Sequence, residues 1–561
     1  MLPINSQLTS HISNLTSNIP LVSAQKESSN LLTPVINQKL FYYDFWGPNY
    51  KAMENKHVII IGGGMGGLSA GTYLRMNGYD TTIFEMSGNP GGLCTSWERK
   101  NYKVDLCIHW LVGSGKGSSF YERWNELIRM EEIRFVNHDE YFRMEDQQGK
   151  YISVFTNLDL LESEFLLKAP EDEKEIRKFI KAVRKFLSLD LIPGKSDDIA
   201  NLWEKMKVGW KLLPYLPCFA SYIKYSCRDY SKKFKNPLLR KTIEYLFDPE
   251  MSIVFSMMAI TWFHKKTAGY PIGGSLNFAL KVYDRYIESG GAINFGAKVV
   301  KILTENNKAI GVELENGETH FAEYIISAAD GHATIFEMLG GMYTNEKLLE
   351  FYKTAKTFPS LVFVALGIRK DFAGQPRSVF LPAAKPIYLD PETKLSEVGF
   401  YIHNFDKTLA PAGSTLITCM LETRNYDYWN KLHRDDPAQY ESEKKRIAGE
   451  LIEILDKRYG GAKENVEMID VATPVTFKNS SGNWKGSFEG WLLTPETGFR
   501  RLSHTLPGLD NFYMCGQWVA IGGGLPGVLS SGRDTAEIIC HKDKILFKVI
   551  SPEKAKVPEM A

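Results

Sequence analysis

A short run of β-branched residues leads directly into a cluster of glycines near residue 60. The segment His57–Ile61 has the composition of a buried strand, and glycines follow at positions 62, 63, 64, 66 and 67. A helical pattern then extends from Met65 to Asn77, and a second strand at 81–84 ends in Glu85. This order of strand, glycine turn, helix, strand and acid predicts a βαβ unit at the start of a parallel sheet.

Each part of this unit suits the binding of a dinucleotide. Gly62 permits the tight turn out of the strand, Gly64 lets the backbone approach a pyrophosphate, and Gly67 lets the helix pack close to the strands. The helix begins at Met65 and Gly66, where free N–H groups and the positive end of the helix dipole would face the phosphates.

The acid at the end of the second strand and two further glycines indicate which dinucleotide binds. Glu85 stands where a carboxylate can accept hydrogen bonds from ribose hydroxyls. Gly71 and Gly78 fall where the extended form of the motif, common in FAD proteins, has small residues. FAD is therefore the expected cofactor.

Downstream segments resemble the superfamily of flavoproteins that contains the amine oxidases and phytoene desaturases. Gly91 and Gly92, shortly after Glu85, are similar to its second flavin motif. Arginine often follows that pair, but Leu93 stands there in this chain. This departure and the segment Val104–Trp110 resemble the branch of carotenoid isomerases and retinol saturases.

Three later stretches agree with the resemblance: Tyr270–Ser275, Gly296–Asp330 and Asn511–Val528. By that resemblance the backbone of Val299 would meet the adenine, and the last stretch would face the flavin with its backbone and a helix N-terminus. The further cofactor-binding residues that the resemblance implies are Val299, Gly516, Gln517, Leu525, Gly527 and Val528. Members often carry an acid where Gln517 stands.

The expected fold class is α/β, with a Rossmann-type FAD-binding domain and an interleaved α+β substrate domain. The FAD-binding domain is expected at 53–130, 265–345 and 501–550, and the substrate domain at 131–264 and 346–500. Residues 1–52 are expected to be a disordered extension, and residues 551–561 a tail.

Composition excludes several classes of function. The formal net charge is +1, so nothing indicates a nucleic-acid partner. The seven cysteines form no CxxC pair and no metal-ligand pattern, which favours reduced thiols in a cytoplasmic protein and no bound metal. No apolar run reaches the roughly 18 residues of a membrane span, and no pattern indicates an oligomeric state.

Two segments are candidates for contact with a lipid. Residues 203–235 combine tryptophans and other apolar side chains with eight Lys or Arg against two acids, a composition that suits a membrane interface or a surface helix pair packed on its own domain. Residues 247–263 are dense in methionine and aromatic side chains, which could line a lipid tunnel or fill a core.

The resemblance implies an FAD-dependent oxidoreductase of the desaturase, saturase or isomerase type that acts on a hydrophobic polyene, such as a carotenoid or retinoid. His109 is the candidate catalytic residue, because it follows the family-like segment and could face the flavin; a structural histidine is the alternative. Two other functions share the fold: a flavin amine oxidase, and a non-catalytic lipid-binding protein of the Rab escort type.

Overall fold

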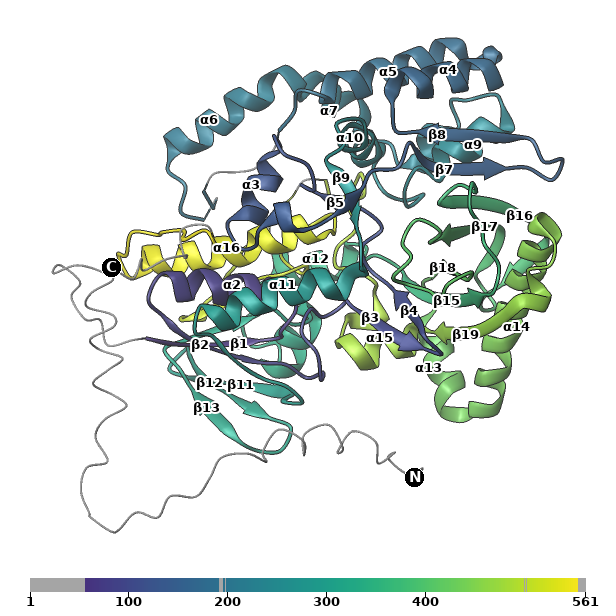
Figure 1. Ribbon diagram of the computed structural model, residues 1–561. Coiled ribbons are helices and arrows are strands. Elements are labelled where there is room, and N and C mark those ends of the chain that lie inside the picture. Colours follow the sequence, from purple (N-terminus) through teal and green to yellow (C-terminus); the bar gives the residue numbers. More distant parts are fainter. Residues whose placement is uncertain (1–55, 191–194, 197, 499, 501, 553–561) are drawn as a thin grey trace, which may run out of the picture. The chain divides into compact units, whose positions relative to one another are not determined.

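The computed structural model in Figure 1 describes residues 56–190, 195–196, 198–498, 500 and 502–552. The predicted extension at 1–52 and most of the predicted tail lie outside these residues. A five-stranded sheet carries the predicted glycine turn, with strand order β10–β2–β1–β14–β20 and every pair parallel. Its strands are β1 His57–Ile61, β2 Asp80–Phe84, β10 Ala292–Asn294, β14 Tyr324–Ser327 and β20 Phe512–Met514.

Strand β1 is apolar on both faces because both faces of the parallel sheet are covered. Val58 and Ile60 pack with the helices α2 (Met65–Met76), α11 (Gly274–Glu288) and α16 (Leu525–Lys542). Ile59 and Ile61 point the other way, to the antiparallel strands β11 (Val299–Glu305), β12 (Lys308–Leu314) and β13 (Thr319–Phe321). Figure 1 shows these three layers, with the helices above the sheet and the antiparallel strands below it.

A seven-stranded sheet forms the second large part, in the order β19–β15–β18–β17–β16–β7–β8. Its strands are β7 Glu140–Glu145, β8 Tyr151–Phe155, β15 Ser360–Ile368, β16 Ser378–Tyr388, β17 Lys394–Ile402, β18 Thr415–Thr423 and β19 Val466–Ala472. Strand β7 pairs with β16 in parallel, whereas the other pairs are antiparallel. The two long segments on either side of residues 265–345 therefore build one sheet together.

The two faces of this sheet differ. Ile417, Cys419 and Leu421 of β18 lie in the core that the sheet shares with α14. The alternate residues of β18 point to the opposite face, where the sheet meets the rest of the molecule. The remaining helices are α3 Ser119–Asn125, α4 Leu158–Lys168, α5 Glu173–Phe186, α6 Leu202–Leu212, α7 Leu216–Tyr222, α8 Cys227–Ser231, α9 Pro237–Glu244, α10 Ile253–His264, α12 Glu346–Thr354, α13 Tyr426–Asp435, α14 Pro437–Tyr459 and α15 Pro474–Ser481.

Short strands connect the two parts across the expected domain boundaries. Strand β9 (Ala268–Pro271) pairs with β5 (Leu111–Val112) on one side and with β6 (Phe135–Val136) on the other. A hairpin of β3 (Ser96–Arg99) and β4 (Tyr102–Asp105) follows the second glycine pair. Strand β6 falls in an expected substrate segment, whereas its partner β9 falls in an expected FAD segment. This pairing crosses an expected boundary, and the domain boundaries stay a prediction. Over the part of the chain that the structure describes, no helix is long and apolar enough to cross a bilayer.

The C-terminal helix begins within the stretch Asn511–Val528 that resembles a flavin motif. Its first residue is Leu525. Pro526 lies in the first turn of α16, where the missing N–H of proline breaks no helical hydrogen bond. Proline therefore helps to start this helix at the glycine-rich turn.

We expect Gly67→Ala to destabilise the protein and Gly209→Ala to stabilise it. A Cβ at Gly67 would overlap the carbonyl oxygen of Gly62, and forcing extra volume into a packed site costs about 1–3 kcal/mol. A Cβ at Gly209, inside α6, would meet no atom within 4 Å, and alanine favours the helix by up to about 1 kcal/mol. Thermal unfolding midpoints of both variants measure this; a Gly67→Ala midpoint at or above that of the wild type would contradict it.

Candidate active site

The turn between β1 and α2 brings the first glycines together with their helix. Gly62 has a φ of 98°, which favours glycine, and its N–H donates to the carbonyl oxygen of Phe84 at 2.8 Å. Gly64 is the N-cap of α2, and its carbonyl oxygen accepts from the N–H of Leu68 at 3.0 Å. Met65 and Gly66 form the first turn of α2, so their N–H groups have no partner within the helix.

The second glycine pair lies directly against the first turn. The N–H of Gly91 donates to the carbonyl oxygen of Gly63 at 2.9 Å, and Gly64 bridges Gly91. A Cβ at Gly92 would meet only the Cα of Gly64, at 3.3 Å. The two turns thus face each other without side chains between them.

Glu85 is fixed beside this glycine cradle. Its Oε2 accepts from the N–H of Gly63 at 2.6 Å, and its Oε1 accepts from the N–H of Ser87 at 2.8 Å. The carbonyl oxygen of Glu85 also accepts from the N–H of Ala297 at 2.9 Å, which places the buried Val299 at the start of β11 near the same end of the cradle. This is the arrangement expected for the adenosine half of a dinucleotide.

The C-terminal motif meets the first turn from the other side. A Cβ at Gly66 would lie 2.9 Å from the Cα of Gly516 and 3.4 Å from Cγ1 of Val528. The N–H of Gly516 donates to Oγ of Ser531 at 2.7 Å. Gln517 is occupied elsewhere, since its Nε2 donates to Oδ1 of Asn483 at 3.1 Å.

The predicted cofactor residues therefore fit FAD. The two glycine turns leave bare backbone for the diphosphate, and the N-termini of α2 and α16 offer N–H groups to it and to the flavin. Leu525 and Gly527 open onto a cavity, whereas Leu93 is half-buried against the core that contains β4. FAD, when bound, supplies an acceptor or donor of hydride. The roles of the single residues stay a prediction.

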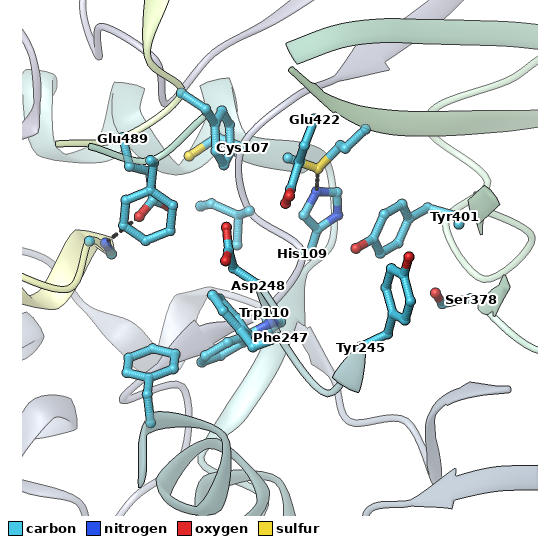
Figure 2. A pocket seen from close by; sticks show the side chains of 18 of the residues that line it. Cys107, His109, Trp110, Tyr245, Phe247, Asp248, Ser378, Tyr401, Glu422 and Glu489 are labelled. Carbon is cyan, nitrogen blue, oxygen red and sulfur yellow. Dashed lines mark hydrogen bonds between the residues drawn. The ribbon is translucent and has the colours of Figure 1, made fainter. Parts of the chain in front are cut away.

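A cavity of about 410 Å³ begins at the glycine-rich turn before α16. Its walls come from α10, β5, β15–β18 and the loops at 247–249 and 488–489. Figure 2 shows aromatic rings around the space and carboxyl groups that point into it. Its apolar lining includes Trp110, Phe120, Phe142, Phe247, Phe255, Trp262, Phe358, Phe380 and Phe488.

His109 lines this cavity but is not poised to carry a proton. Its ring stacks on Tyr401 at 4.2 Å between centroids, and its Nε2 lies 2.8 Å from Sδ of Met420. Burial lowers the pKa of His109 to about 3, assisted by His403 and the buried Arg377. The imidazole is thus neutral at ordinary pH, and a catalytic role for His109 stays a prediction.

The cavity also contains polar side chains that the sequence analysis does not single out as site residues, among them Cys107, Asp248, Glu397, Glu422 and Glu489. Contact with Cys94, together with burial, raises the pKa of the Cys107 thiol. Burial raises the pKa of Glu489 to about 7, although its Oε2 accepts from the N–H of Gly524 at 3.2 Å. Asp248 has Glu250 close by and Cys107 has Asp105 and His109, so neither stands out in its segment. Alternation along β18 puts Glu422 on one face of the strand but does not show what covers that face.

The methionine-rich segment at 247–263 divides between cavity and core. Phe247, Phe255 and Trp262 line the cavity. Met251, Ile253 and Met257 are fully buried in the packed interior instead. The aromatic residues of this segment thus meet the open space, whereas two of its methionines fill the core.

A family model described as flavin containing amine oxidoreductase matches residues 65–540. The chain belongs to this family. FAD is accordingly its cofactor and it is an FAD-dependent oxidoreductase, which leaves the non-catalytic Rab escort alternative without support.

Curated relatives of this flavin oxidoreductase agree with the predicted branch. It is 25% identical over 505 residues to the chloroplastic prolycopene isomerase of Daucus carota, covering 84% of this chain and 78% of that protein. It is 24% identical over 526 residues to a 4,4'-diapophytoene desaturase of Methylomonas sp, covering 89% and 98%. The resemblance to the carotenoid desaturase and isomerase branch is thereby confirmed.

Solved structures agree with the predicted fold class. An oxidoreductase from Methanosarcina mazei has a TM-score of 0.54 at 19% identity, covering 86% of this chain and all of that one. Wild-type putrescine oxidase bound to putrescine has a TM-score of 0.56 at 12% identity, covering 87% of this chain and 99% of that one. The Rossmann-type FAD-binding domain with its interleaved α+β part is confirmed.

We expect Glu85→Gln to weaken FAD binding about 10- to 100-fold, because hydrogen bonds to a charged group contribute about 1.5–3 kcal/mol. Titration of the deflavinated protein with FAD, followed by flavin fluorescence, measures the Kd. Glu98→Gln, on the exposed end of β3, is the control and should bind as the wild type does. An unchanged Kd in a folded Glu85→Gln protein would remove Glu85 from the nucleotide site.

Proposed function

We propose that this FAD-dependent oxidoreductase desaturates, saturates or isomerises a conjugated polyene lipid inside the aromatic cavity. The observation that carries the proposal is the continuity between the flavin turn and the cavity. Gly522, Gly523 and Gly524, at the N-terminus of α16, line the same space as Trp110 and Trp262. A chain that enters this space would lie beside the flavin.

The relatives' names support a polyene as the substrate class. The aligned proteins include prolycopene isomerases, a diapophytoene desaturase and phytoene desaturases, each matched over more than four fifths of this chain. A hydrocarbon chain needs apolar walls that orient it and exclude water, and the cavity provides them.

A flavin amine oxidase is the second function that this fold serves, and the structural neighbour putrescine oxidase binds an amine. Leu93 replaces the arginine that often follows the second glycine pair in the superfamily. The relatives over most of the chain carry carotenoid names, which favours the polyene.

We expect at least one polyene either to reoxidise the photoreduced flavin or to reduce the oxidised flavin, about tenfold or more faster than buffer does. The holoenzyme, photoreduced or oxidised, is mixed without oxygen with carotenoids, retinoids, unsaturated fatty acids and quinones, and the flavin absorbance is followed. Free FAD with each compound is the control. Reduction of the oxidised flavin by amines, with no response to any polyene, would favour the amine oxidase and end this proposal.

We further propose that the segment from α6 to α7 rests on an anionic membrane surface from which the substrate enters. Helix α6 has no buried residue, so a capping box of Asn201 and Glu204 supports it rather than packing. Trp203 and Trp210 are 73% and 69% exposed, among lysines at 205, 207 and 211. Apolar rings with a basic surround suit anionic head groups.

The adjacent helix links this surface to the cavity. Helix α7 contacts α10, and Phe219 and Ile223 pack against the core in which α10 lies. The side chains Phe255 and Trp262 of α10 line the cavity. Figure 1 shows α6 and α7 in succession beside α10, with α6 extending away from it.

We expect the double variant Trp203→Glu, Trp210→Glu to lose at least about tenfold in binding to anionic vesicles, because each ring contributes apolar burial. Sedimentation with vesicles of phosphatidylglycerol and phosphatidylcholine measures the bound fraction. Leu167→Glu on α4, where the leucine is 75% exposed, is the matched control. Equal sedimentation of the double variant and the wild type would contradict the membrane contact.

A further inference from the structure

We infer that Glu422, held beside Asp248, exchanges the proton that accompanies hydride transfer between the substrate and the flavin. This inference rests on the proposed function and names a catalytic group for it. Neither residue belongs to the nucleotide-binding frame.

The sheet register places Glu422 in the cavity wall. It lies opposite Leu361 of β15, which also lines the cavity, and shares its face of β18 with Met420. Its side chain keeps accessible surface, and that surface opens to the cavity. Figure 2 shows the carboxyl groups of Glu422 and Asp248 pointing into the same space, near the ring of His109.

No hydrogen bond or ion pair holds the Glu422 carboxyl among the residues that the structure describes. Asp248 is fixed, since its Oδ1 accepts from the N–H of Glu250 at 2.6 Å. The carboxyl of Glu422 is accessible from the cavity, so a substrate there can reach it, and titratable groups with a raised pKa in a cleft gather at functional sites.

The charges around Glu422 favour its protonated form. Asp248 and Glu250 are the acids that face Glu422, and Arg424 and Arg228 are the facing cations. Arg424 is engaged by Oε2 of Glu250 at 2.6 Å and by the carbonyl oxygen of Thr357 at 2.9 Å. Burial and then Asp248 raise the pKa of Glu422 to about 8, and burial also raises the pKa of Asp248.

The other carboxyls of the cavity are engaged. Glu397 forms an ion pair with Lys241, and Glu489 accepts from the N–H of Gly524. Lys241 favours the ionised form of Glu397, whereas burial raises the pKa of Glu489 to about 7 although Gly524 holds its Oε2. Neither carboxyl is as free of partners as that of Glu422.

The neutral polar groups of the cavity are also unsuited to this task. His109 has its pKa lowered to about 3, so it is a neutral imidazole near neutrality and a weak base. Burial raises the pKa of Tyr245 and of Tyr401, so neither phenol releases a proton near neutrality. Glu422 and Glu489 are thus the cavity carboxyls whose pKa is raised to about 8 and about 7, and of these two Glu422 has no hydrogen-bonding partner among the described residues.

The reaction balances with this assignment. In a desaturation, one C–H bond breaks and its electron pair leaves with the hydrogen as hydride to oxidised FAD. The C–H bond on the adjacent carbon breaks, its electrons form the new double bond, and the proton passes to the Glu422 carboxylate. In a saturation, one carbon of the double bond would receive hydride from reduced FAD, and the π electrons would form the new C–H bond at the other carbon with the proton that Glu422 gives up, leaving its carboxylate.

The direction of the reaction sets the sign of the pH dependence. A desaturation needs ionised Glu422, so its rate should rise as pH rises through about 8. A saturation needs protonated Glu422, so its rate should fall over the same interval.

We expect Glu422→Gln to slow the reaction of the flavin with a polyene about 100-fold or more and to abolish the limb of the pH profile near 8. FAD binding and reoxidation by ferricyanide should stay at wild-type values. Glu392→Gln, at an exposed position outside the cavity, is the matched control. A Glu422→Gln variant with the wild-type rate and pH profile on a reacting polyene would overturn the inference and leave the proposed function standing.

Infrared difference spectra of the holoenzyme without substrate give a second readout. The protonated carboxyl band should disappear as pH rises through about 8, be missing in Glu422→Gln, and titrate at lower pH in Asp248→Asn, which removes the neighbouring charge. A band unchanged by both substitutions overturns the assignment. If the wild type reacts with no polyene, the proposed function and this inference are overturned together. If the substitution Glu422→Gln raises only the KM for an amine, Glu422 binds an ammonium group instead.

Discussion

Direct contact between glycine backbones is the constraint on which the rest of this structure depends. A Cβ at Gly532 would lie 2.6 Å from the carbonyl oxygen of Gly66, and one at Gly66 would lie 2.9 Å from the Cα of Gly516. Helices α2 and α16 therefore approach closely where α16 carries no side chain at Gly532, and the turn at Gly516 approaches α2 where Gly66 carries none. This contact brings together α2, near the start of the described chain, and α16, near its end, and it forms the surface on which FAD fits. The same backbone contact therefore shapes the nucleotide site and packs the two ends of the fold together.

The nucleotide half of the site could be predicted from the sequence because its determinants are local. Gly62, Gly64 and Gly67 lie close together in one turn, and only one helix and one strand separate this turn from Glu85, so the position of Glu85 can be predicted from the chain itself. The three layers around β1 follow from four consecutive buried β-branched residues, Val58–Ile61. Backbone geometry of this kind needs no knowledge of distant partners.

The cavity could not be predicted in the same way, because its walls come from strands that are far apart in the sequence. Trp110, Phe247 and Tyr401 meet only after β16, β17 and β18 have paired. Glu422 follows the alternation of β18, in which a glutamate ordinarily marks the solvent face. Whether that face meets solvent or a cavity depends on what covers the sheet, which the pattern of one strand does not contain.

The groups that fit the cofactor and the groups that could transfer a proton also lie on different parts of the fold. The groups that fit FAD lie on the parallel sheet and its helices, whereas Asp248, Glu422 and Glu489 lie on the seven-stranded sheet and nearby loops. A change at Glu422 can thus alter how a proton is handled without touching the glycine cradle. Relatives with the same frame carry the names of isomerases and desaturases. In this chain the groups that fit a hydride carrier and the candidate proton-transfer group lie on different elements, which suits reactions in which hydride and proton need different partners.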